Sequence, residues 1–184
     1  RNITIGWEAY NNSDTENDNI AIGYNAMTTN TAGGTRNIAV GNYALDALTS
    51  GDDNVAVGYD AMTANTTGGA NVAVGAYALD TNSTGDNNVA VGKVALGANT
   101  TGAGNTAVGY ASLDANTTAD NNTAVGLRAL SANTTGATNT AVGMNALILN
   151  STAEYNTGIG AYALAATTTG SYNTALGRSA GLAI

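Results

Sequence analysis

Two columns of aspartates are the side chains of this chain that are best suited to chemistry. Their members recur every 34 residues: Asp46, Asp80 and Asp114 form one column, and Asp52, Asp86 and Asp120 form the other. Calcium prefers carboxylate and carbonyl oxygens, and the runs at 51–54 and 85–88 could supply several of them. The spacing matches neither an EF-hand loop nor a calcium-binding nonapeptide. We therefore expect turn-capping carboxylates, with calcium sites as the alternative.

Aromatic side chains form a second candidate site. They are Trp7, Tyr24, Tyr43, Tyr59, Tyr77, Tyr110 and Tyr162, and all stand at two neighbouring variable positions of a repeated unit. Aromatic rings on a polar surface can bind the face of a sugar or a protein partner. The alternative is that they shield a thin core or pack between chains. We predict one exterior stripe of candidate surface contacts.

Several chemistries are ruled out by composition. The chain has no histidine and no cysteine, which excludes zinc sites and the serine–histidine and cysteine–histidine constellations. A carboxylate pair for glycoside hydrolysis should interrupt the repeat, whereas these aspartates follow it. Gly92-Lys93 lacks the serine or threonine of a phosphate loop. We expect no enzymatic activity, no cofactor and no catalytic or metal-binding residue.

Charge narrows the class of partner. The formal net charge is −8, with only five lysine and arginine residues, so nucleic acid and anionic membrane surfaces would repel the chain. No apolar run reaches the length of a membrane-spanning helix, and no signal peptide is visible. We expect a single repeat domain over 1–184, cut from a longer extracellular fibrous protein.

A repeated unit must position these side chains. Its glycine recurs eleven times, every 17 residues except for an interval of 18 between Gly23 and Gly41. Counting from an asparagine as position zero, position one is Ile, Val or Thr, position two is mostly Ala, and position three is Ile, Val or Leu. Position four is glycine, position seven is Ala and position eight is Leu or Met in most units. We assign a structural ladder to Asn54, Asn71, Asn88, Asn105, Asn122, Asn139, Gly58, Gly75, Gly92, Gly109, Gly126 and Gly143.

The unit predicts one coil of a parallel β-solenoid. Mid-unit glycine and β-branched residues oppose a helix, whereas Thr123 and Val125 pointing one way and Ala124 the other suit a short strand. We expect Val125 inside, a bend at Gly126 and a second strand at 129–130. Coils stacked about 4.8 Å apart would form a rod on the order of 50 Å long.

The stacking of coils predicts structural roles for the asparagine, aspartate and alanine residues of the unit. Asparagines in register can bond to one another along the rod, and skipping a coil separates like-charged aspartates. Alanines at positions two and seven would form a surface that a partner approaches closely, which motivates a homo-oligomer. Asn-Thr-Thr segments begin at Asn65, Asn99, Asn116 and Asn133, and Asn-Ser-Thr segments begin at Asn82 and Asn150. They fit polar turns with threonine ladders; glycosylation and ice binding are the alternatives.

The stretch from Asn105 to Leu113 resembles the head repeats of YadA-type trimeric autotransporter adhesins, and also repeats in some phage tail fibres. The shared features are the turn asparagine, the Ala-Ile/Val-Gly strand and a following x-x-Ala, and they cover essentially the whole chain. The resemblance implies a left-handed β-roll closed as a homotrimer and used for attachment. It predicts an adhesive fibre segment at a bacterial cell or phage surface, with a glycan or protein receptor. A self-assembling filament is the alternative, and an ice-binding solenoid is a more distant one.

Overall fold

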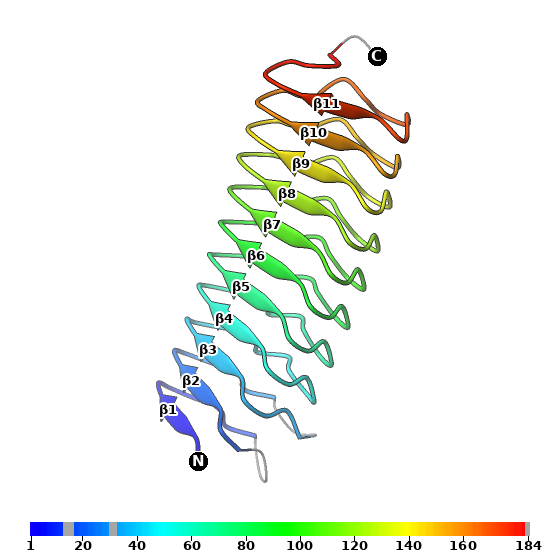
Figure 1. Ribbon diagram of the computed structural model, residues 1–184. Coiled ribbons are helices and arrows are strands. Elements are labelled where there is room, and N and C mark those ends of the chain that lie inside the picture. Colours follow the sequence, from blue (N-terminus) through cyan, green and yellow to red (C-terminus); the bar gives the residue numbers. More distant parts are fainter. Residues whose placement is uncertain (13–16, 30–32, 183–184) are drawn as a thin grey trace.

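The computed structural model describes residues 1–12, 17–29 and 33–182 and shows an all-β rod (Figure 1). Eleven parallel strands stack in sequence order in one sheet, and no helix occurs among the described residues. The strands are β1 (Ile3–Ile5), β2 (Ile20–Ile22), β3 (Ile38–Val40), β4 (Val55–Val57), β5 (Val72–Val74), β6 (Val89–Val91), β7 (Thr106–Val108), β8 (Thr123–Val125), β9 (Thr140–Val142), β10 (Thr157–Ile159) and β11 (Thr174–Leu176). The prediction of a parallel β-solenoid is confirmed, with about ten turns of about 17 residues.

Equivalent residues lie directly above one another. Ala107 pairs with Ala124, and Val108 pairs with Val125. The longer second unit keeps this register, since Ile20 of β2 still pairs with Ile38 of β3. Each coil therefore presents the same side chains at the same places along the rod.

The prediction of a second strand at 129–130 is wrong. Leu130 has a φ of 56°, in the left-handed region that no β-strand uses. The residues at positions six and eight repeat this conformation in neighbouring coils, for example Tyr77 (φ 59°) and Leu79 (φ 51°). Each such residue costs roughly 1–2 kcal/mol, and burial of the leucine at position eight offsets a cost of that size.

The strands are turned inside out relative to the prediction. Ala124 is fully buried, whereas Thr123 and Val125 are only partly covered. Alanine fits inside because position two packs against the leucine column: a Cβ added at Gly158 would lie 3.3 Å from Cγ of Leu147. A larger side chain there would overpack the narrow interior.

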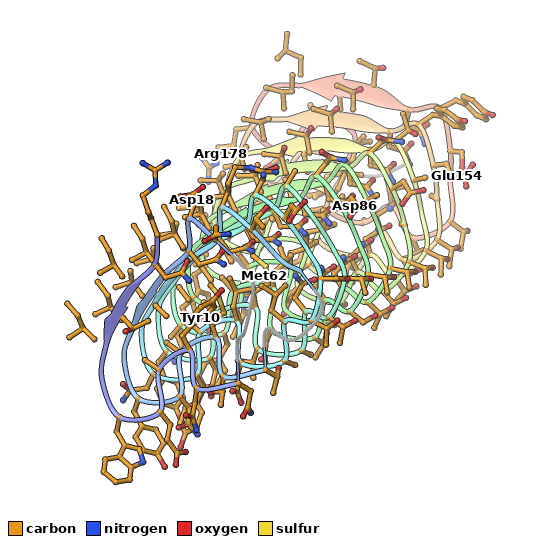
Figure 2. The ribbon with its side chains drawn as sticks, turned by 90° about the horizontal axis from the view of Figure 1, so that it is seen from below. Tyr10, Asp18, Met62, Asp86, Glu154 and Arg178 are labelled. Atoms are coloured by element: carbon orange, nitrogen blue, oxygen red, sulfur yellow. The ribbon has the colours of Figure 1, made fainter. Side chains whose placement is uncertain are left out.

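The expected alanine docking surface therefore does not exist. The alanines of positions two and seven both lie in the core, as at Ala73 and Ala78. Figure 2 looks along the rod and places Met62, at position eight, within the coil. The outward side of the sheet instead carries the side chains of positions one and three, which we call the strand face.

Candidate functional site

The asparagines at position zero hold adjacent coils together from within. Asn122 is fully buried. Its Oδ1 accepts a hydrogen bond from the backbone N–H of Asn139 at 2.8 Å, and its Nδ2 donates to the carbonyl of Gly136 at 2.9 Å. The same pattern joins Asn54 to Asn71 and Asn88 to Asn105. This column therefore satisfies polar groups inside the rod and presents nothing to a ligand.

A second buried asparagine column runs beside the first. It consists of Asn65, Asn82, Asn99, Asn116, Asn133 and Asn150. Nδ2 of Asn82 donates to Oδ1 of Asn65 at 3.0 Å and to the carbonyl of Gly85 at 3.0 Å. These amides are fully covered and bonded in the folded chain, which supports a structural role for the column.

The threonine or serine directly after each asparagine of this column bonds to the next coil through its hydroxyl. The hydroxyl of Thr66 donates to the carbonyl of Ser83 at 3.0 Å, and that of Thr100 donates to the carbonyl of Thr117 at 2.9 Å. The next threonine of each segment, as at Thr67, Thr101 and Thr135, is exposed, so the ice-binding alternative stays a prediction.

The glycines at position four mark the closest contact between coils. Gly92 has a φ of 134°, and a Cβ added there would lie 2.5 Å from the carbonyl oxygen of Gly109. Gly58, Gly75, Gly126 and Gly143 have the same constraint. Only glycine combines this backbone conformation with such an approach, so the glycine column is structural.

The aspartates at position 15 cap the neighbouring coil. Oδ1 of Asp86 accepts a hydrogen bond from the backbone N–H of Gly69 at 2.7 Å, and Asp120 does the same for Ala103 at 2.7 Å. Asp52 caps Thr35. These bonds run from one coil to the coil before it, so the carboxylates at position 15 have a structural role.

At the same turn, Arg36 binds Asp53 through two hydrogen bonds, of 2.6 and 2.8 Å. The hydrogen bond from Arg36 lowers the pKa of the Asp53 carboxyl below its usual range. Both groups are exposed, so the pair contributes little to stability.

The predicted aromatic residues divide into a connected group and isolated ones. Tyr24, Tyr43, Tyr59 and Tyr77 form the tyrosine ladder, with successive ring centroids 5.4, 6.1 and 5.5 Å apart in edge-to-face geometry. Trp7, Tyr110 and Tyr162 are exposed and have no ring contact within the described part of the chain. The residue pattern missed a stacked pair, Tyr155 and Tyr172, whose centroids are 5.1 Å apart.

An open groove of about 330 Å³ lies at the end of the tyrosine ladder. Its lining residues come from the β5, β6 and β7 coils and are Tyr77, Asp80, Val94, Gly97, Ala98 and Asp114. We call it the Asp80 groove. Asp80, Gly97 and Asp114 all occupy position nine, so the missing side chain at Gly97 separates the two carboxylates. The aspartate column singled out in the sequence thus lies beside the aromatic column.

The surroundings of the two groove carboxylates make their negatively charged form less favourable. Burial raises the pKa of Asp80, and the nearby charge of Asp60 raises it further. Burial also raises the pKa of Asp114, although its backbone N–H and Arg128 partly oppose the shift. Asp80 accepts no hydrogen bond from the described residues, in contrast to the capping aspartates of position 15.

The described residues contain no cluster of three or more acidic side chains that could hold a metal ion. Nor does any described helix have the length and apolar character needed to cross a membrane. Comparisons with protein-family models, curated proteins and solved structures found no match. The rod presents three features to solvent: the strand face, the tyrosine ladder and the Asp80 groove.

Proposed function

We propose that this chain is a rigid segment of an extracellular homotrimeric fibre that mediates attachment at a bacterial cell or phage surface. The Asp80 groove is open to solvent, and the internal bonds of the rod repeat in almost every coil. Such a shape suits a spacer that presents an outer surface. The proposal includes the left-handed β-roll geometry of the adhesin heads that the repeats resemble.

The strand face is the main structural support for a homo-oligomer. It runs the whole length of the sheet and carries only Ile, Val, Leu and Thr. Val57, Val74 and Val91 are each 36% exposed. Eight of the 22 residues of the strand face are exposed, and the other fourteen are half-buried. A continuous face of exposed and half-buried apolar side chains is typical of a surface that another chain covers.

The occupant that best fits this face is another copy of the same chain. Two chains with a formal charge of −8 repel each other, but the strand face has no charged side chain. Its coil spacing is the same in every copy, so ridges of valine on one chain can register with grooves on the next. Close packing along the axis would leave the turns with the tyrosine ladder free for a receptor.

Sedimentation equilibrium tests the oligomer. We expect the wild-type mass to correspond to three chains, and Val91→Lys to lower it because a buried ammonium group is costly. Thr101→Lys is the matched control, since Thr101 lies in the same coil but is exposed on another wall. Circular dichroism establishes that both variants stay folded.

A folded wild-type monomer would refute the proposal, as would a Val91→Lys trimer. A mass that grows continuously with concentration would favour the filament alternative over the trimer.

A further inference from the structure

We propose that the Asp80 groove binds a neutral saccharide, with Tyr77 contacting the face of the sugar ring and Asp80 and Asp114 accepting hydrogen bonds from its hydroxyls. The inference rests on the attachment function proposed above and adds a site and a class of receptor. It combines a cavity, an aromatic wall and two carboxylates in one place.

The groove exists because of a glycine that the fold does not require. Gly97 lies outside the positive-φ region, and an added Cβ would come no closer than 3.3 Å, to the carbonyl oxygen of Val94. Other coils carry Ser131 or Ile148 at this position. Gly97 therefore differs from Gly92 of the same coil, where a Cβ would collide with the next coil. A residue that departs from its column without a backbone reason is a candidate for function.

The walls of the groove match the two surfaces of a sugar. Tyr77 is 37% exposed, and with Val94 and Ala98 it offers an apolar wall for the C–H face of a pyranose. Asp80 accepts no hydrogen bond from the described residues. The backbone N–H groups of Asp114 and Ala115 act on the Asp114 carboxylate, but its Oδ1 has no hydrogen-bond partner among the described residues. Sugar hydroxyls are donors, and buried acceptors gain from such partners.

The separation of the carboxylates favours a ring-sized ligand over a small cation. Asp80 and Asp114 are two coils apart, which is about 9.6 Å along the rod. One ammonium or metal ion contacts its ligands at about 2–3 Å, so it would engage one carboxylate at a time. A saccharide can reach both ends with different hydroxyls.

Local charge selects a neutral glycan. The Asp60 carboxylate acts on Asp80 through its charge, and Asp46 acts on Asp60 in the same way. A sialylated or sulfated sugar would add negative charge to this surface and be repelled. Arg128, the cation that acts on Asp114, opposes only part of this field.

The test is a glycan array of neutral gluco-, galacto- and manno-oligosaccharides probed with the full chain, followed by titration calorimetry with the best binder. Gly97→Ile fills the groove with a side chain that the column already tolerates at Ile148. We expect its Kd to rise at least tenfold. Ser131→Ile is the matched control at position nine of the β8 coil, and its Kd should equal that of wild type.

A second pair of variants tests the aromatic wall. Tyr77→Ala should weaken binding at least tenfold, whereas Tyr162→Ala, an exposed tyrosine at the same position of the β10 coil, should not. The inference is overturned if wild type binds no neutral oligosaccharide, or if Gly97→Ile binds as wild type does. Salt-sensitive binding of poly-lysine in place of the sugars would also overturn it.

Sedimentation of the same samples separates this inference from the proposed function. A trimer that binds no sugar refutes only the groove. A monomer that binds sugar and loses it in Gly97→Ile refutes the trimer but not the saccharide site.

Discussion

Gly92→Ala tests whether the coil spacing is set by the glycine column. Gly92 has a φ of 134°, and the new Cβ would lie 2.5 Å from the carbonyl oxygen of Gly109 in the next coil. The backbone conformation costs about 1–3 kcal/mol for a residue with a side chain. Relieving the overlap costs about 1–3 kcal/mol more. We expect a loss of about 2–6 kcal/mol in the free energy of unfolding.

Gly97→Ala is the matched control, because it makes the same substitution five residues later in the same coil. Its φ is not positive, and the nearest contact is 3.3 Å. Replacing such a glycine also reduces the entropy of the unfolded chain, which is worth about 0.4–1 kcal/mol. We therefore expect a change within about 1 kcal/mol of wild type.

Urea unfolding followed by circular dichroism measures both variants. Solenoids can unfold in parts, so hydrogen exchange at the Gly109 amide supplies a local measurement. This amide donates to the carbonyl of Val91 at 2.8 Å, across the contact in question. The reasoning is refuted if Gly92→Ala matches Gly97→Ala in stability and leaves the Gly109 amide as protected as in wild type.

Three further predictions concern the polar groups. Asn122→Ala removes the acceptor of a 2.8 Å bond and a 2.9 Å donor from the interior, so urea unfolding should show a loss of about 2–4 kcal/mol; a loss below about 1 kcal/mol would contradict this. Because burial raises the pKa of Asp80, wild-type stability should fall as pH rises from about 4 through the raised pKa. Asp80→Asn should reduce that slope in a series of thermal melts and melt higher than wild type at pH 7; an unchanged slope argues against the burial effect. Asp86→Ala removes the cap on Gly69, so the Gly69 amide should exchange faster while global stability changes by about 1 kcal/mol or less; unchanged exchange would show that the bond is not maintained in solution.

The period of the sequence is sufficient to predict the solenoid. A single unit cannot bury its apolar residues alone, whereas stacked units with a constant period bury them in one continuous core. It is not sufficient to decide which side of a strand lies inside. Alternation separates Ala124 from Thr123 and Val125, but either face satisfies it. Valine is the larger apolar residue, so burying it looked favourable. The leucine at position eight already fills the interior, and from β2 to β11 the position opposite it holds only alanine or glycine.

The second asparagine column was misjudged for a related reason. Asn-Thr-Thr-Gly has the composition of an exposed turn, and nothing in a single unit shows that the asparagine is fully covered. Comparison between units does carry the signal, since Leu48 occupies the same position and is also buried. A leucine that can replace an asparagine identifies an interior position at which the amide bonds to other coils.

The Asp80 groove illustrates what a repeat conceals. Gly97, Ala98 and Val94 look unremarkable alone, and their arrangement matters only because Tyr77 and Asp114 lie one coil to either side. The positions that hold the same residue in every unit are those at which adjacent coils contact each other. The repeat therefore reflects the packing of the rod. Positions free of that packing can vary, and among them Gly97 is small without a backbone requirement. A glycine of that kind indicates space kept for something outside the chain, which is why the groove, rather than the ladders, is where we place recognition.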